Sequence, residues 1–389
     1  MTLWLPPAPL RRAVIAPAMV LLTAAVLGLT PIVVLVLAFA VRFLPGRWRA
    51  LRLYWFLVVY LVRESTGIVA LAALWVLSGF GWKLRTDRYQ RAHVRLIGWY
   101  LRGLVGSAAR VLGLRLVSEG VPDDLAIAEP LLASPDADDV PVLVFSRHAG
   151  AGDSFILAHL LVNTYGRRPR IVLKDLLQLD PCIDIVLNRL PNRFISPNPP
   201  VGSGVVESIT DLAVGLEDDG ALILFPEGGN FTEHRRLAAI QRFETAGLTD
   251  AARKARALTH LLPPRPGGTF AAIDACDDAD VLFVAHTGLE QLSSPMDLWR
   301  GLPMDREVRL AWWTVRAEDV PRDPEERIDW LFEWWELIDT WIEERRDPSL
   351  PSRPLVAPSV HRTRSTESGA VAEAAQVTPP AGGTAEASR

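Results

Sequence analysis

Two long apolar runs open the chain, and a longer part with strand-like and helix-like patterns follows them. The first run, from about Val14 to Val41, is nearly uncharged and long enough to cross a bilayer as a helix. A cleaved signal peptide normally has a shorter apolar core, followed by a small-residue cleavage site. We therefore expect the first run to be a retained membrane anchor.

The second run, from about Leu53 to Leu77, differs because Arg63, Glu64 and Ser65 lie near its middle. A charged side chain at the bilayer centre costs about 2.5–3.5 kcal/mol, so a clean second span is not expected. Two interpretations stay open: a single span followed by an interfacial helix, and a helical hairpin that dips into one leaflet. Arginines flank both runs, and either arrangement keeps the rest of the chain on the arginine-rich, cytoplasmic side.

Between about Thr86 and Leu112, apolar residues recur at helical spacing among several arginines. One interpretation is a surface helix that packs on a folded domain. The other is a basic amphipathic helix that lies on anionic lipid.

After this helix, apolar runs of strand length alternate with helical patterns. The expected strands are Arg115–Val117, Val140–Ser146, Arg170–Leu173, Arg193–Ile195, Ala221–Phe225, Val281–Ala285 and Val308–Val315. The expected helices are Ser154–Asn163, Val205–Glu217, Arg235–Thr245, Thr249–Leu262 and Arg322–Arg345. This alternation predicts an α/β fold with a mixed, largely parallel sheet flanked by helices. The tryptophans of the last helix are expected in the core rather than at a membrane surface.

The patterns predict three parts: N-terminal membrane-anchoring helices over residues 1–82, an α/β domain over residues 83–347 and a tail over residues 348–389. The tail is rich in Ser, Thr, Pro, Ala and Gly and has few large apolar residues. Such a segment cannot bury enough apolar surface to offset its ordering entropy, so we expect it to be disordered.

Composition excludes several classes of function. The 389 residues carry a net charge of only −4 at pH 7, which indicates no nucleic-acid partner. Cys182 and Cys276 lie far apart and lack zinc-ligand spacing, so neither a disulfide framework nor a metal site is expected. We find no Gly-x-Ser-x-Gly segment of the kind that carries a serine hydrolase nucleophile.

The first candidate site follows the apolar strand that ends near Ser146. His148 and Asp153 are separated by a turn that contains Gly150 and Gly152, and these glycines let the chain fold back so that the carboxylate faces the imidazole. A carboxylate bonded to one imidazole nitrogen stabilises the cation that forms when the other nitrogen takes a proton. The pair therefore suits a general base for a hydroxyl nucleophile. Asp153 is also in place for an ordinary helix N-cap, so spacing alone leaves both roles open.

The second candidate site is a glycine turn after a later apolar strand, in the segment Phe225-Pro226-Glu227-Gly228-Gly229-Asn230. The glycines let backbone N–H groups approach a ligand closely, as in anion-binding nests. Arg235 and Arg236 follow within a few residues and supply charge. A tight turn with a solvated glutamate is the alternative.

Together and in this order, the two segments resemble the glycerolipid acyltransferase family that includes the 1-acylglycerol-3-phosphate acyltransferases. That family carries a His-x4-Asp motif first and a Phe-Pro-Glu-Gly motif later. The segments Ile171–Asp175, Phe225–Arg236 and Leu261–Gly268 are similar to its lysocardiolipin and lysophosphatidylinositol acyltransferase branch. The resemblance covers roughly Pro141 to Trp341.

The resemblance implies a membrane-bound enzyme that moves an acyl group from a thioester to the hydroxyl of a lysophospholipid such as 1-acyl-sn-glycerol-3-phosphate. His148 would take the hydroxyl proton, Asp153 would orient His148, and the turn of Glu227, Gly228 and Gly229 would hold the acceptor. The donor would be acyl-CoA or an acyl carrier protein thioester, with no metal or other cofactor. Membrane lipids would be the remaining partners.

The sequence departs from the family pattern at three places. Arg147 stands where the family usually has Asn, and Gly229-Asn230 stands where it has Thr-Arg. We expect Arg147 to supply the missing phosphate-binding charge. The arginine that usually ends the second motif is also absent, and Arg193 is favoured over Arg189 as its replacement. These departures keep open a larger head group, a glycolipid acceptor, or a catalytically inactive lipid-binding membrane protein.

Overall fold

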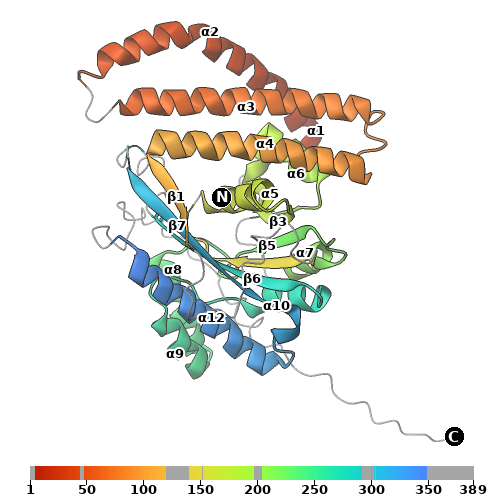
Figure 1. Cartoon of the computed structure of the whole chain (residues 1–389), viewed down its shortest axis with the longest axis vertical. Helices are drawn as coiled ribbons and strands as arrows, with labels where there is room; N and C mark the ends of the chain where they lie inside the picture. The colour runs from red at the N-terminus through yellow and green to blue at the C-terminus, as the bar shows by residue number, and fades with distance from the viewer. Residues whose placement is uncertain are drawn as a thin grey trace, which may run out of the picture.

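The computed structural model describes residues 5–43, 48–119, 140–150, 152–196, 204–290, 299, 302 and 304–347. The predicted disordered tail over 348–389 lies outside the described residues. A layer of N-terminal helices is stacked on an α/β domain (Figure 1). The domain boundary expected after residue 82 stays a prediction.

A sheet of seven strands, in the order β1-β7-β6-β2-β5-β3-β4, is the centre of the α/β part. All neighbouring strands are parallel except the antiparallel pair β6 and β7, so the mixed, largely parallel sheet is confirmed. The strands are β1 (Leu114–Ser118), β2 (Val142–Ser146), β3 (Arg168–Lys174), β4 (Arg193–Ile195), β5 (Gly220–Leu224), β6 (Asp280–Thr287) and β7 (Arg306–Val315). Each predicted strand corresponds to one of these.

Helices cover both faces of the sheet (Figure 1). In the α/β part they are α5 (Asp153–Asn163), α6 (Pro181–Arg189), α7 (Val205–Ala213), α8 (Glu233–Thr245), α9 (Thr249–Ala257), α10 (Pro266–Ala275) and α12 (Pro324–Arg345), with short helices η3 (Asp175–Leu179) and η4 (Ala317–Asp319). Helices α6 and α10 were not predicted from the sequence. Both begin with a proline, which is well placed at the first position of a helix although it breaks a helix interior.

Two predicted helices end earlier than expected. Helix α7 ends at Ala213 rather than Glu217, and α9 ends at Ala257 rather than Leu262. Pro263 and Pro264 follow the expected end of α9, and a proline disfavours helical geometry in the residue before it. The segment between α9 and α10 is therefore available to cross beside the site turns.

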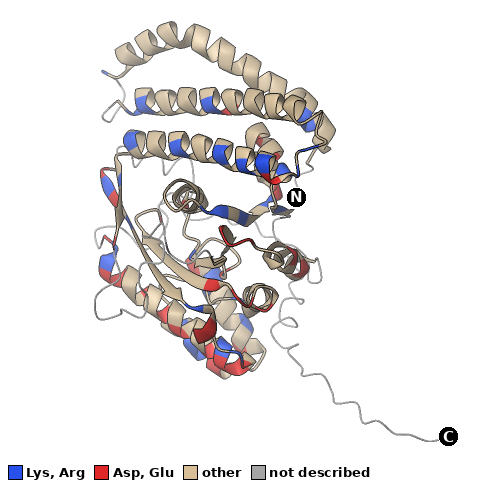
Figure 2. Cartoon of the chain, turned by 45° about the vertical axis from the view of Figure 1, so that its right-hand side comes forward, with Lys and Arg blue, Asp and Glu red and all other residues tan. Residues whose placement is uncertain are grey.

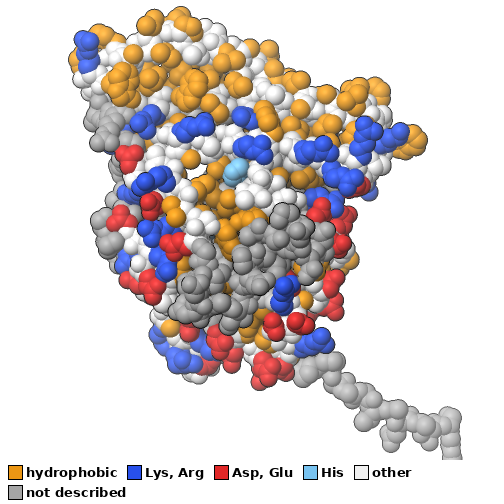
Figure 3. Space-filling view, in the orientation of Figure 1, with side chains coloured by type: hydrophobic (Ala, Val, Ile, Leu, Met, Phe, Trp, Pro, Cys, Tyr) orange, Lys and Arg blue, Asp and Glu red, His pale blue; other side chains and the backbone are white. Residues whose placement is uncertain are grey.

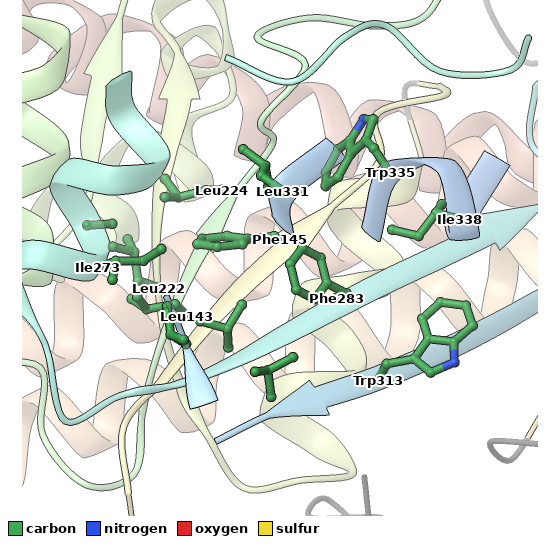
Figure 4. Packing of buried hydrophobic residues seen from close by; sticks show 14 of the residues in the cluster. Leu143, Phe145, Leu222, Leu224, Ile273, Phe283, Trp313, Leu331, Trp335 and Ile338 are labelled. Atoms are coloured by element: carbon green, nitrogen blue, oxygen red, sulfur yellow. The ribbon is translucent and has the colours of Figure 1, made fainter. Parts of the chain in front are cut away.

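The main core lies between the sheet and α12 (Figure 4). Phe145 on β2 and Phe283 on β6 are fully buried and meet edge to face. Trp334 of α12 stacks on Phe283 with ring centroids 4.7 Å apart, and Trp335 is also fully buried. The core position predicted for the tryptophans of the last helix is confirmed.

The N-terminal helices are α1 (Ala8–Leu10), η1 (Arg11–Ile15), α2 (Ala16–Ala40), α3 (Arg49–Leu77) and α4 (Asp87–Leu112). By length and composition alone, Ala8–Ala40 and Arg49–Leu77 are each able to cross a membrane. Helices α2, α3 and α4 are stacked on one another, and α4 packs on α5 of the α/β part (Figure 1). The interpretation of α4 as a helix packed on the domain is therefore confirmed.

The polar residues in the middle of α3 face protein. Glu64 is fully buried, and its carboxylate accepts a 2.7 Å hydrogen bond from the Cys182 N–H at the start of α6. Ser65 is within 2.7 Å of the Thr23 hydroxyl of α2. One face of α3 is thus joined to its neighbours, while many large apolar side chains of α2 are exposed.

Candidate active site

The turns that follow β2 and β5 form the candidate active site. The two strands are parallel neighbours, with Phe145 opposite Leu224, so their carboxyl ends reach the same edge of the sheet. A backbone hydrogen bond joins the two turns, because the Phe231 N–H donates to the His148 carbonyl at 2.8 Å. Ligand sites of open α/β sheets form at this edge. The structure thus brings the two segments predicted from sequence together.

His148 and Asp153 form a hydrogen-bonded pair. Nδ1 of His148 donates to Oδ2 of Asp153 at 2.9 Å, and Asp153 is the first residue of α5. The ring of Phe225 stacks on the imidazole with centroids 4.5 Å apart. The His148 side chain is 13% exposed, and its Nε2 has no hydrogen-bond partner within the described part of the chain. Orientation by Asp153 and Phe225 leaves that nitrogen available to a ligand.

Asp153 is held as a buried carboxylate. Its Oδ2 also accepts the N–H groups of Ala149 at 2.9 Å and Gly150 at 3.1 Å. Burial alone would raise the pKa of Asp153, but the hydrogen bond from His148 and the positive potential of His286 and His148 lower it to about 2. Asp153 is therefore ionised at neutral pH and stabilises positive charge on His148.

Glu227 is buried beside His148, and its carboxylate links its own turn to the backbone at His148 and at Leu262. It is 1% exposed, and Oε1 accepts the backbone N–H of His148 at 2.7 Å. Its Oε2 accepts the Leu262 N–H at 2.9 Å. Burial raises the pKa of Glu227 to about 7, against the opposing effects of Arg147 and the two backbone donors. Each carboxylate oxygen is thus engaged by main chain, and the predicted contact with the acceptor stays a prediction.

His286 is a buried neighbour of the pair and was not predicted as a site residue. Its Nε2 donates to the Arg147 carbonyl at 3.3 Å and lies 3.8 Å from Oδ2 of Asp153. Burial, followed by the charge of Arg147, lowers the pKa of His286 to about 4, so the ring is neutral at pH 7. His286 lies at the carboxyl end of β6, which pairs in parallel with β2, so its position at the end of an apolar strand could have indicated that it lies near the site.

Arg147 has partners of its own. Its side chain is 1% exposed, and Nη1 donates to the His286 carbonyl at 2.6 Å and to Oε1 of Glu290 at 2.8 Å. Nη2 donates to the His260 carbonyl at 3.4 Å. The guanidinium neutralises Glu290 and joins the segments that carry His260 and His286. The predicted role of Arg147 in acceptor binding stays a prediction, and the buried position gives it no support.

Two other arginines lie across the glycine turn. Gly228 has a positive φ of 67°, and a Cβ built on it would come within 2.9 Å of the Arg265 guanidinium carbon. A Cβ on Gly229 would come within 2.6 Å of Nη1 of Arg235, which donates to the Asn230 carbonyl at 3.1 Å. Glycine at both positions therefore lets the two side chains lie directly on the turn. Arg265 belongs to a segment singled out by the family resemblance, but its place over Gly228 was not predicted.

Arg193, expected to bind the acceptor, begins the edge strand β4. Its side chain is 53% exposed and lies 3.5 Å from the Asp211 carboxylate. Arg189, the less favoured choice, donates to the Leu71 carbonyl of α3 at 2.9 Å. The role of Arg193 stays a prediction, as does the absence of a metal; among the described residues no group of three metal-ligating side chains occurs.

The Acyltransferase family model matches residues 129–286, which include the His148 and Glu227 turns but make up less than half of the chain. No curated protein matches the sequence. Among solved structures, the 1-acyl-sn-glycerophosphate (LPA) acyltransferase PlsC from Thermotoga maritima is similar, at 14% sequence identity and a TM-score of 0.42. The alignment covers 75% of this chain and 97% of that chain. At this TM-score the likeness carries no weight for fold or function.

Proposed function

We propose that the protein is an O-acyltransferase that moves a fatty acyl group from a thioester to the hydroxyl of a lysophospholipid. The observation that carries the proposal is the 2.9 Å bond between His148 and Asp153 beside the turn of Glu227, inside the segment that matches the Acyltransferase model. The specific branch within the family, suggested by the longer motifs, belongs to the proposal as well.

In the proposed reaction, Nε2 of His148 removes the proton of the acceptor hydroxyl as its oxygen attacks the thioester carbonyl. The new C–O ester bond forms as the C–S bond breaks, and the imidazolium returns the proton to the thiolate. Asp153 keeps Nδ1 protonated and stabilises the imidazolium. Because the acyl group passes directly to the acceptor, no acyl-enzyme forms. The donor is acyl-CoA or an acyl carrier protein thioester.

Arg235 and Arg265 are the proposed ligands of the acceptor phosphate. Both side chains are exposed and lie on the Gly228-Gly229 turn, which follows directly on the residue bonded to His148. A guanidinium binds a phosphate through two parallel N–H donors, which fixes orientation as well as charge. These arginines would replace the one that the family places where this chain has Asn230.

Helices α2 and α3 are proposed to sit in one leaflet, with the site on the cytoplasmic side. Helix α3 runs along α4, whose several arginines are costly to place in hydrocarbon, so a full span of α3 beside α4 is unfavourable. The hairpin interpretation avoids this cost, because the exposed apolar side chains of α2 meet lipid while α4 stays at the surface.

Product analysis tests the proposal. Purified full-length protein would receive a mixture of lysophosphatidic acid, lysophospholipids with larger head groups and a glycolipid, together with one acyl-CoA. Mass spectrometry is expected to find an acylated product from at least one lysophospholipid and none with His148→Ala. Product from the glycolipid alone would change the acceptor class, and no product with either acyl-CoA or an acyl carrier protein thioester would refute acyl transfer.

A further inference from the structure

A groove between α3 and α4 lies outside the proposed catalytic site. Its volume is about 420 Å³. Trp55 and Val59 of α3 form an apolar wall, and Arg63, Arg102 and Arg110 line it with positive charge. Nothing in the proposed acyl transfer uses these residues.

Two glycines of α4, Gly103 and Gly106, line the groove. The Arg63 guanidinium lies so close to Gly103 that a Cβ at that position would collide with it. The same guanidinium stacks 4.2 Å from the centroid of the Trp99 ring and donates to the Trp99 carbonyl at 2.8 Å. A Cβ on Gly106, in contrast, would meet nothing within 4 Å. Gly106 thus faces unfilled space, and Arg63 is already held in place at its edge.

The polar groups of the groove match an anion. Its titratable lining residues are three arginines, and no carboxylate is among the described lining residues. Ser107 also lines the groove; the residue is only 6% exposed, and its hydroxyl has no hydrogen-bond partner within the described part of the chain. Leaving a buried hydroxyl unpaired is unfavourable, so a ligand oxygen placed there would satisfy it. Nη2 of Arg102 donates to Oδ1 of Asn163 at 2.8 Å, and the guanidinium has further N–H groups that can donate to a ligand.

The position of the groove indicates an amphipathic ligand. Lys and Arg positions, coloured blue on the ribbon, recur along α4, which lies directly below α3 (Figure 2). The space-filling view shows the same row of positive charge between the apolar upper part of the molecule and the rest of the domain (Figure 3). Trp55 is 59% exposed at the apolar side of the groove, and an acyl chain of a bound ligand would leave the groove there. Aromatic and basic side chains occur together at the membrane–water interface.

We infer that this groove binds one anionic phospholipid of the surrounding bilayer. Its phosphate would accept hydrogen bonds from Arg63, Arg102 or Arg110 and from the Ser107 hydroxyl, while an acyl chain would lie along Trp55 and Val59. The inference does not depend on the proposed acyl transfer, since within the described part of the chain no hydrogen bond joins these residues to the turns of His148 or Glu227.

Filling the groove is the first test. Gly106→Leu places a side chain in open space, and Gly28→Leu is its matched control, because a Cβ on Gly28 of α2 also meets nothing within 4 Å. Native mass spectrometry of the full-length protein in detergent would measure binding of phosphatidylglycerol. Gly106→Leu is expected to weaken binding of the tightest-bound lipid about tenfold, or about 1.4 kcal/mol, because the leucine side chain occupies space that the lipid needs, while Gly28→Leu matches wild type.

Removing one charge is the second test. Arg110→Gln is expected to weaken phosphatidylglycerol binding to a similar degree, and Arg95→Gln, at another exposed arginine of α4, is expected to change it little. Inorganic phosphate should not displace the lipid, and phosphatidylcholine should bind more weakly. Equal lipid binding by wild type, Gly106→Leu and Arg110→Gln, or equal losses with both controls, would overturn the inference. Displacement by inorganic phosphate alone would overturn the lipid assignment.

Discussion

The carboxylate of Glu227 accepts the backbone N–H of His148 at 2.7 Å, so the turn after β5 fixes the main chain that carries the imidazole. The second oxygen of Glu227 fixes Leu262 in the same way. The two motifs, 79 residues apart, therefore form one unit in which Glu227 holds the backbone of the proposed base. Direct contact with the acceptor, predicted from the sequence, would be a second role of the same carboxylate.

Glu227→Gln is expected to separate these two roles. The amide has only one oxygen, so one buried backbone donor loses its partner, at a cost of about 1–3 kcal/mol. If Glu227 positions His148, kcat falls and the KM for the acceptor changes little. A raised acceptor KM with normal kcat would instead indicate direct acceptor binding. Steady-state kinetics beside the control Glu207→Gln, an exposed glutamate of α7, makes the comparison.

The pH dependence of stability is a second prediction for Glu227. Its pKa is raised from 4.5 to about 7, so the folded protein keeps a proton that the unfolded chain releases. Stability from this group is complete below pH 4.5 and is lost as pH rises through about 7. His286 opposes this trend, because its pKa is lowered from 6.5 to about 4 and the folded state gains stability as pH rises over that range.

Glu227→Gln removes only the first of these effects. Between about pH 5 and 7, the thermal unfolding midpoint of the variant is therefore expected to rise more steeply with pH than that of wild type. Thermal scans of both proteins in one detergent over this range provide the measurement. Parallel curves for the two proteins would show that Glu227 is not protonated in the folded state.

Asp153→Asn is expected to lower kcat by about 10²–10⁴-fold, the usual contribution of a positioned general base. The neutral amide cannot stabilise the imidazolium. If its NH₂ group takes the place of Oδ2, it meets the donors Nδ1 of His148 and N–H of Ala149 and cannot accept from them. Asp219→Asn, which changes a partner of Arg168 at the far end of β5, is the control. Wild-type kcat in Asp153→Asn would show that Asp153 serves only as the start of α5.

Arg265→Gln and Arg235→Gln are expected to raise the KM for the lysophospholipid without changing the KM for the acyl thioester. Each removes a guanidinium from the Gly228-Gly229 turn, and loss of a charged hydrogen bond weakens binding by about 1.5–3 kcal/mol. Arg242→Gln, on the same helix as Arg235, controls for net charge. Arg193→Gln in the same series tests the role predicted for that residue from sequence. Unchanged acceptor KM in Arg265→Gln, Arg235→Gln and Arg193→Gln would place the phosphate elsewhere.

Most of the sheet could be predicted because its strands are short apolar runs bounded by Gly, Pro and charged residues. The helices that were missed, α6 and α10, begin with Pro181 and Pro266, and a proline read as a breaker hides a helix that starts there. Polar residues in the second apolar run raised doubt about a membrane helix. That doubt concerned Arg63, Glu64 and Ser65. The partner of Glu64, Cys182, lies 118 residues away, so a local pattern could not reveal it.

The His148–Asp153 pairing was predictable because both residues and the glycines between them lie within one short turn. The direction of the Arg147 side chain was not, because its partners Glu290, His286 and His260 come from distant segments. Likewise, Arg265 reaches Gly228 only because the chain after α9 crosses beside the turn, where the Arg265 N–H donates to the Pro226 carbonyl at 2.8 Å. Contacts of this kind depend on tertiary structure rather than on spacing.

The initial rate of acyl transfer by His148→Ala tests the central claim most directly. The control is His234→Gln, which changes an exposed histidine of α8. Measured with acyl-CoA and the preferred lysophospholipid, the His148→Ala rate is expected to fall by about 10²-fold or more, while His234→Gln keeps the wild-type rate. A correctly folded His148→Ala protein that transfers acyl groups as fast as wild type would contradict the account.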